Sequence, residues 1–164
     1  MVLGGMIMRK SGILGVLLIS CLLTACGSNP MAEIYENDSK IASEGNSFSY
    51  YEDIEQNVED SSFIASVQGM DGMDTVWTYN AETESEIQID FDMALSVGNV
   101  KVVFISPDGQ LDTIAECTEE ETLEGTKAVA VKKGENRIKI VSREKAEFDI
   151  SLNIDEGTFE KLSF

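Results

Sequence analysis

The sequence predicts an all-β protein, an antiparallel β-sandwich of about eight strands in a jelly-roll-like arrangement. Apolar residues recur at every second position through much of residues 46–164, which is the period of a strand with one buried face. Turn-forming residues interrupt this alternation at nearly regular intervals, and scarcely any stretch has a helical period. About 119 residues are enough for one core, so we expect a single domain.

Two stretches alternate most clearly. Residues 86–93 and 146–154 each place apolar side chains between acidic, amide or hydroxyl side chains. A helix would spread the polar groups around its circumference, whereas a strand places all of them on its solvated face. We therefore expect both stretches in an antiparallel sheet. The same pattern over shorter runs predicts six more strands, at residues 63–68, 75–80, 100–106, 111–117, 127–132 and 137–141.

Three glycine-containing sequences are expected to connect strands. Pro107-Asp108-Gly109 combines a fixed φ, a side-chain acceptor and a residue that adopts positive φ without strain. Gly134 gives the same freedom to Lys133–Asn136, and Val97-Gly98-Asn99 closes a third connection.

The last two predicted strands are expected to pair as a hairpin. The register that keeps their apolar side chains on one face sets Lys139 opposite Glu147 and Arg137 opposite Asp149. Each such pair of opposite charges contributes about 0.2–1 kcal/mol. A register shifted by one residue would bury those charges.

The first 26 residues have the pattern of a secretory leader. Arg9 and Lys10 supply a positive start, residues 13–23 supply an apolar run, and Leu23-Thr24-Ala25-Cys26 places small residues before a cysteine. The alternative is an ordinary membrane-spanning helix. The stretch Ser11–Ala25 is shorter than the roughly 20 apolar residues that such a helix needs.

Leu23-Thr24-Ala25-Cys26 resembles the lipobox of bacterial prolipoproteins. The resemblance implies that the Cys26 thiol is diacylated, with palmitate as an expected fatty acid, and that cleavage makes Cys26 the first residue of the mature chain. Two or more acyl chains anchor a protein stably. We therefore expect a lipid-anchored protein of the cell membrane or the outer membrane, with its domain outside the cytoplasm.

These features divide the chain into three parts. Residues 1–25 are the expected signal peptide, and residues 46–164 are the expected sandwich domain. Residues 26–45 are mostly small and polar, and we expect them to form a flexible tether. A coil of that length spans about 25 Å, so the tether would hold the domain clear of the membrane surface.

Charge excludes one class of partner. The chain has 30 acidic and 12 basic residues, and Arg9 and Lys10 leave with the leader. The mature chain then carries a net charge of −20, which repels phosphate backbones, so nucleic acid is not an expected partner. Solvation of the surface accounts for the acidity more simply than a specific cation site does.

Cysteine and histidine usage argues against nucleophilic and zinc catalysis. Cys21 leaves with the leader and Cys26 is expected to be acylated, so Cys117 is the remaining thiol. The sequence contains no histidine that could activate this thiol or bind zinc. We expect Cys117 to act as a small apolar residue at the end of a strand rather than as a nucleophile.

Four aromatic residues are candidate ligand-binding residues. Trp77 and Tyr79 alternate on one face of a predicted strand, and Tyr50 and Tyr51 lie upstream. Exposed aromatic rings stack on sugar rings in many β-sandwich modules, so these residues are candidates for a glycan-binding face. Core packing is the favoured alternative, because tryptophan and tyrosine in strands usually bury most of their area.

Carboxylates offer a candidate calcium site. Asp71 and Asp74 flank a glycine turn, and calcium prefers such oxygen ligands. The spacing does not match an EF-hand, and a turn closed by side-chain hydrogen bonds is the simpler interpretation. Further candidate oxygen ligands are Asp90, Asp92, Asp108 and Asp112.

A carboxylate pair such as Asp90 and Asp92, about 7 Å apart along a strand, also fits the separation used in some glycoside hydrolases. Any alternating strand offers the same spacing, so hydrolysis ranks third among the expected functions.

Seven of the ten basic residues after the leader lie between Lys127 and Lys145. They would either dock an acidic partner or a cell-wall polymer, or neutralise neighbouring strands and protect an edge, and we favour the structural role.

The mature part resembles small bacterial β-sandwich lipoproteins without an assigned activity. Residues 100–109 and 134–140 carry this resemblance together with the lipobox, and they specify strands and turns rather than catalytic groups. We expect a noncatalytic binding or accessory module that recognises a cell-wall glycan or an envelope protein. The alternative is a structural or assembly subunit of an envelope complex.

Overall fold

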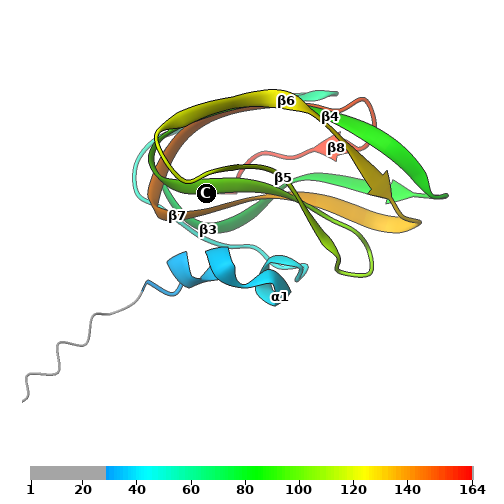
Figure 1. The fold of residues 1–164 in the computed structure, drawn as a ribbon, viewed down its shortest axis with the longest axis horizontal. Helices are drawn as coiled ribbons and strands as arrows, with labels where there is room; N and C mark the ends of the chain where they lie inside the picture. Colours follow the sequence, from blue (N-terminus) through cyan, green and yellow to red (C-terminus); the bar gives the residue numbers. More distant parts are fainter. Residues whose placement is uncertain (1–28, 164) are drawn as a thin grey trace, which may run out of the picture.

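The computed structural model describes residues 29–163, which form an antiparallel β-sandwich with one layer above the other (Figure 1). The predicted all-β fold class is confirmed. No helix within residues 29–163 is long and apolar enough to cross a bilayer. The elements of this part are η1 (Ala32–Glu36), α1 (Asp38–Ile41), β1 (Ser47–Tyr50), β2 (Ile54–Glu59), β3 (Ser62–Ala81), β4 (Ser85–Ile105), β5 (Leu111–Cys117), β6 (Glu121–Val131), β7 (Gly134–Asn153) and β8 (Thr158–Phe159).

Three long strands run through both layers. β3, β4 and β7 contain 20, 21 and 20 residues, against a usual strand length of about 5–6. The upper layer in Figure 1 has the order β2, first half of β3, second half of β7, first half of β4, β6. The lower layer has β1 and β8 at one edge, then the other halves of β3, β7 and β4, and finally β5.

Backbone irregularities bend each long strand near its middle. The pairing of β3 with β7 shifts around Gly69 and Gly72, whose φ angles are 89° and 108°. The pairing of β4 with β7 shifts around Gly98, at a φ of 77°. In β7 the bend contains Glu144 and Lys145, which adopt φ angles of 63° and 51°. Residues with positive φ change the direction of a strand without reversing it. Each long strand therefore continues into the other layer.

The three bends lie side by side at the left of Figure 1. Residues 142–147 of β7 pair with residues 68–72 of β3 on one side and with residues 97–99 of β4 on the other. We call these three stretches the bend end.

The predicted hairpin of the last two strands is wrong. Residues 137–141 and 146–153 are the two halves of β7, because the positive φ angles between them produce a bulge and not a turn. Lys139 lies opposite Thr75 of β3 and Val103 of β4. The expected charge pairs with Glu147 and Asp149 are therefore not formed.

The expected flexible tether is also wrong for its described part, residues 29–45. This segment, which we call the N-terminal clasp, forms η1 and α1 beneath the lower layer (Figure 1). Ile34, Tyr35 and Ile41 are buried against a second apolar cluster on the lower layer, made of Met73, Val103, Ile105 and Val141. These three apolar residues, spread through a polar stretch, supply the packing energy that a free coil lacks. The predicted lipidation site, Cys26, lies outside the described residues.

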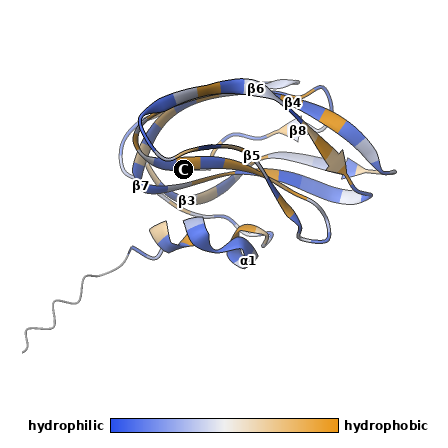
Figure 2. Cartoon of the chain, in the orientation of Figure 1, coloured by the Kyte–Doolittle hydropathy of each residue, from blue (hydrophilic) through white to orange (hydrophobic). Residues whose placement is uncertain are grey.

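The main core lies between the layers. Phe63, Trp77, Ile89, Ile140 and Leu152 are buried there. Figure 2 shows hydrophilic and hydrophobic bands alternating along the strands, which confirms the predicted period of two. The polar residues of this alternation form the outer face of the upper layer.

Candidate functional site

An open groove of about 720 Å³ crosses the outer face of the upper layer. Strand pairing aligns the side chains of this face in two rows that run across all five strands. The first row is Asn57, Ile64, Ser151, Asp92 and Glu124, and the second is Glu55, Ser66, Asp149, Ala94 and Thr122.

Residue size explains why this face is hollow. Ser66, Ser151 and Ala94 stand on the three central strands, where short side chains leave space above the sheet. Longer side chains on β2, such as Glu55 and Asn57, form one border. Ile64 projects into the groove from β3 with half of its surface exposed, and it is the large apolar group of the lining.

Every charged residue on the outer face of the upper layer is acidic. Glu55, Asp92 and Asp149 line the groove, and none of them forms a hydrogen bond or an ion pair within residues 29–163. Strand register places no lysine or arginine on this face, whereas the acidic residues on it are Glu55, Glu59, Glu86, Asp90, Asp92, Glu124, Glu147 and Asp149.

The groove offers several kinds of contact to a ligand. Its free carboxylates accept hydrogen bonds, its serine and threonine hydroxyls both donate and accept, and Ile64 offers an apolar contact. Such a lining matches a hydroxyl-rich or positively charged ligand and disfavours an anionic one.

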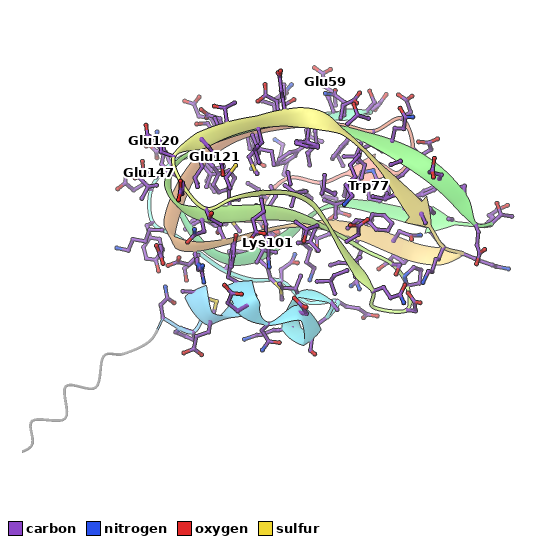
Figure 3. The ribbon with its side chains drawn as sticks, in the orientation of Figure 1. Glu59, Trp77, Lys101, Glu120, Glu121 and Glu147 are labelled. Carbon is purple, nitrogen blue, oxygen red and sulfur yellow. The ribbon has the colours of Figure 1, made fainter. Side chains whose placement is uncertain are left out.

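The predicted aromatic face is not formed. Trp77 is fully buried between the layers (Figure 3), and its indole Nε1–H donates to the Glu156 carbonyl at 2.8 Å. Tyr79 is half-buried beside it, with ring centroids 5.9 Å apart. The core alternative is therefore the correct one for Trp77, which has no ring face available to a sugar.

The other two aromatic candidates lie apart from Trp77. Tyr50 is half-buried and donates its hydroxyl to Asp74 at 3.3 Å, while Tyr51 is 44% exposed and donates to Asp71 at 3.1 Å. Burial and the neighbouring Asp74 carboxylate raise the pKa of Tyr50. The four aromatic residues thus share no single binding face.

The predicted calcium turn is a hydrogen-bonded bend. Asp71 accepts from the Asn29 side chain at 2.5 Å and from the backbone N–H of Lys145 at 2.8 Å. Asp74 accepts from the backbone N–H of Ser163 at 2.6 Å, and burial raises its pKa to about 6. The two carboxylates share no hydrogen-bond partner. Within residues 29–163 no cluster of three or more acidic, cysteine or histidine side chains is placed to hold a metal.

The remaining aspartates have separate surroundings. Asp90 accepts from the Thr126 hydroxyl, and Asp112 pairs with Lys127 at 2.6 Å. Hydrogen bonds from Lys132 and Ser106 lower the pKa of Asp108 to about 2. Asp92 lines the groove.

Cys117 is fully buried in the main core. Burial, reinforced by the Glu121 and Glu116 carboxylates, raises the pKa of its thiol to about 11. The thiol stays protonated at neutral pH, as expected of a packing residue.

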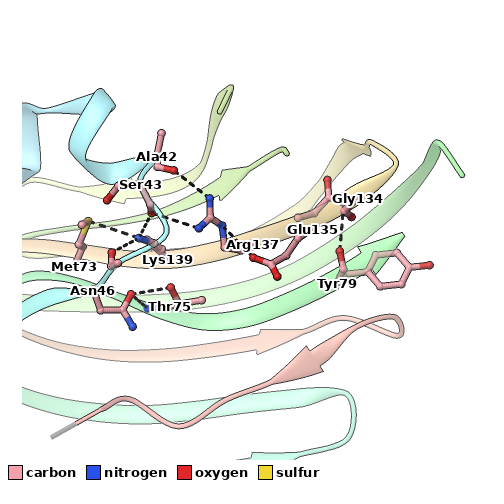
Figure 4. A network of polar contacts seen from close by, with 12 residues as sticks. Ala42, Ser43, Asn46, Met73, Thr75, Tyr79, Gly134, Glu135, Arg137 and Lys139 are labelled. Atoms are coloured by element: carbon pink, nitrogen blue, oxygen red, sulfur yellow. Dashed lines mark hydrogen bonds and ion pairs between the residues drawn. The ribbon is translucent and has the colours of Figure 1, made fainter. Parts of the chain in front are cut away.

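Most of the clustered basic residues form ion pairs or hydrogen bonds within the domain. Lys127 and Lys132 cross from β6 and the turn after it to the β5 side, where they pair with Asp112 and Asp108, each at 2.6 Å. These contacts support the predicted role of protecting an edge. Arg137 and Lys139 point into the N-terminal clasp (Figure 4), and Arg143 pairs with Glu36 at 2.7 Å.

The sequence predicts the strand positions of several groove residues but not the groove itself. The polar positions of the predicted strands 86–93 and 146–154 include Asp92, Asp149 and Ser151. The pairing of these strands with each other and with β2 and β6 depends on long-range register, and no local signal in the sequence specifies it.

Comparisons with known proteins find weak similarity to solved structures. No protein-family model and no curated protein sequence matches the chain. A carbohydrate-binding module from Cellvibrio mixtus lichenase 5A, in complex with cellotriose, aligns with a TM-score of 0.33 and 12% identity over 65% of this chain and 95% of that chain. Peruvianin-I, a cysteine peptidase from Thevetia peruviana latex, aligns with a TM-score of 0.31 and 15% identity over 67% of this chain and 68% of that chain.

Proposed function

We propose that the chain is a lipid-anchored, noncatalytic binding module of the bacterial envelope that holds a glycan in the groove of the upper layer. The observation that carries this proposal is the groove itself, whose carboxylates have no partner within residues 29–163. The lipobox sequence supports the anchor and the location outside the cytoplasm.

The lining favours a neutral or basic glycan. Sugar hydroxyls donate hydrogen bonds to carboxylates such as Asp92 and Asp149, whereas a phosphate- or uronate-bearing polymer would be repelled. Five strands about 4.8 Å apart span roughly 19 Å, a length that suits an oligomer better than a single ring.

The position of the groove also suits a binding module. The N-terminal clasp packs on the outer face of the lower layer (Figure 1). The groove lies on the outer face of the upper layer, on the opposite side of the sandwich. An anchor that enters through the clasp therefore leaves the groove open to ligands.

Isothermal titration of the full-length lipoprotein against a panel of cell-wall and neutral glycans tests the proposal. Ser151→Arg fills the centre of the groove, and Ser39→Arg places the same side chain on exposed α1 at the opposite face. We expect at least a tenfold loss of affinity in Ser151→Arg and none in Ser39→Arg. Absence of heat with every glycan, or equal affinity in the two variants, would refute glycan binding in the groove.

A basic protein partner is the second candidate, as in the assembly-subunit alternative. The acidic residues of the outer face, with no basic residue among them, favour it by charge complementarity. A pull-down from native membranes should then recover a stoichiometric partner, and Asp149→Lys should release it.

The anchor and the lack of catalysis have separate tests. Mass spectrometry of the natural product should find acyl chains on Cys26 and no residue before it.

Inactivity across a glycosidase substrate panel is expected. Hydrolysis that Asp92→Asn abolishes would show that the protein is an enzyme instead.

A further inference from the structure

The N-terminal clasp is a fixed part of the domain. Two cations lie close to the Tyr35 ring, with the Lys101 ammonium and the Arg143 guanidinium each 4.5 Å from its centroid. Its hydroxyl donates to the Glu116 carboxylate at 2.8 Å. Arg143 also pairs with Glu36, so η1 is held by packing, cation–π contacts and an ion pair together.

The second half of the clasp is held by buried cations of β7. The Lys139 ammonium donates to the carbonyls of Ser43 and Gly45, each at 2.7 Å (Figure 4). The Arg137 guanidinium donates to the Ala42 carbonyl at 3.1 Å. These charge-assisted bonds fix backbone that would otherwise be free to leave the sheet.

The clasp is tied to the bend end from its first described residue. The Asn29 amide donates to the Tyr51 hydroxyl at 3.0 Å and to Asp71 at 2.5 Å. Asp71 in turn accepts from the backbone of Lys145, whose ammonium lies 4.6 Å from the Tyr51 ring. The chain therefore enters the folded domain beside the bends that join the two layers.

Only two residues separate Cys26 from Asn29 in the sequence. Three Cα–Cα intervals reach at most about 11 Å, against about 25 Å for the expected 20-residue coil. We propose that the clasp holds the domain directly against the membrane in one orientation, with the clasp side of the bend end toward the lipids and the groove away from them. This inference rests on the proposed lipid anchor at Cys26.

The bend end has a surface suited to a lipid interface. Tyr51 and Val97, both 44% exposed, are two of the three large exposed apolar residues of the described chain. Tyrosine favours the boundary between water and hydrocarbon, and a lysine such as Lys145 extends its ammonium to the headgroups. Glu120, Glu121 and Glu147 gather on the upper side of this end (Figure 3), which makes that side less suited to contact with a lipid surface than the side that carries Tyr51 and Lys145.

Energy transfer in reconstituted vesicles tests the orientation. The full-length lipoprotein is placed in phosphatidylcholine vesicles that contain a headgroup-labelled acceptor lipid. Donor dyes are attached at Glu52→Cys, beside the bend end, or at Gln88→Cys, on the outer face of the upper layer; both positions are exposed, whereas Cys117 is buried and does not react. We expect transfer from residue 52 to be at least twofold more efficient than from residue 88.

A spacer variant provides the matched control. Twenty glycine and serine residues inserted between Ser28 and Asn29 leave every described contact intact and should bring the two efficiencies together. Equal efficiencies in the unmodified chain, or a difference that the spacer does not reduce, would overturn the orientation while leaving the anchor intact. A chain that does not float with vesicles and carries no acyl chain would overturn both the anchor and this inference.

Discussion

At the scale of single residues, Lys139 shows how a neighbour outside the sheet changes the environment of a strand position. The alternation of β7 points Ile138 and Ile140 into the main core and Lys139 to the outer face, where the sequence predicts solvent. The clasp covers that face, and Lys139 becomes fully buried. Burial, together with repulsion from Arg137, lowers its pKa to about 8.

Lys139→Met should therefore change how stability depends on pH. Between pH 8 and the unfolded pKa of 10.5, the unfolded chain holds the lysine proton and the folded chain does not, so this group makes folding more favourable as pH rises. The difference in unfolding free energy between the wild type and Lys139→Met should grow in favour of the wild type by on the order of 3 kcal/mol across that window. Urea titrations at pH 7 and pH 10.5 measure it, and a pH-independent difference would contradict the lowered pKa.

Trp77→Phe should affect stability and not ligand binding. The change removes the hydrogen bond to the Glu156 carbonyl and leaves a gap beside Gly157, where the backbone packs closely on the indole. We expect a loss of about 2–3 kcal/mol in unfolding free energy. Tyr79→Phe, which removes a half-buried hydroxyl, should cost less than about 0.5 kcal/mol. A weaker ligand affinity in Trp77→Phe at unchanged stability would restore the aromatic-face hypothesis.

At the scale of elements, the sequence predicted where strands run better than how they connect. The alternation at 86–93 and 100–106 correctly marks both ends of β4, but Val97-Gly98-Asn99 suggested a connection and is a bend within one strand. A glycine at positive φ serves a turn and a bulge equally well. The outcome depends on the partner strands, which a local pattern does not reveal.

The site was less predictable than the strands. Aromatic residues are candidates for sugar binding because of their usual role in it. The large apolar side chain of Trp77 instead fills the core. The groove depends on the small residues Ser66, Ser151 and Ala94, which become neighbours only after β3, β7 and β4 pair. Small residues carry little chemical signal in a sequence, so the sequence alone does not predict the groove.

Two glycines with nearly equal φ allow a test of the bend. Gly98→Ala would bring its Cβ to 2.6 Å from the Arg143 carbonyl oxygen at a φ of 77°, whereas Gly109→Ala at a φ of 78° would meet nothing nearer than 3.9 Å. We expect Gly109→Ala to cost about 1 kcal/mol of unfolding free energy from backbone strain alone, and Gly98→Ala about 2 kcal/mol more. Chemical denaturation of both variants checks this, and equal losses would argue against close approach at the bend end.

At the scale of the whole molecule, charge is sorted between the two faces. Basic residues fasten the clasp to the lower layer, while the upper layer presents carboxylates to solvent, with Asp92 directly opposite Glu124. Like charges in directly opposed positions destabilise a sheet. The sequence predicted the net charge and its consequence for nucleic acid, but this sorting follows from the register of the strands.

Salt should therefore stabilise the domain. The chain carries a net charge of −18, and the screening length falls from about 30 Å at 0.01 M salt to about 3 Å at 1 M. Thermal unfolding should shift upward by about 3–5 °C between 10 mM and 500 mM sodium chloride, equivalent to roughly 1 kcal/mol. Asp92→Asn should reduce that gain more than Glu82→Gln in the β3–β4 loop, and a Tm independent of salt would contradict self-repulsion.

The three strands shared by the layers also determine how a mechanical pull would travel through the molecule. A load between an anchored N-terminus and a ligand held in the groove passes from the clasp into the lower layer and then along the covalent backbone of β3, β4 and β7 into the upper layer. The load does not have to cross the apolar contact between the two layers, which separates easily when the layers are peeled apart. The clasp continues covalently into β1 and is otherwise held to the sheet through side chains, so these side-chain contacts are expected to yield first under tension.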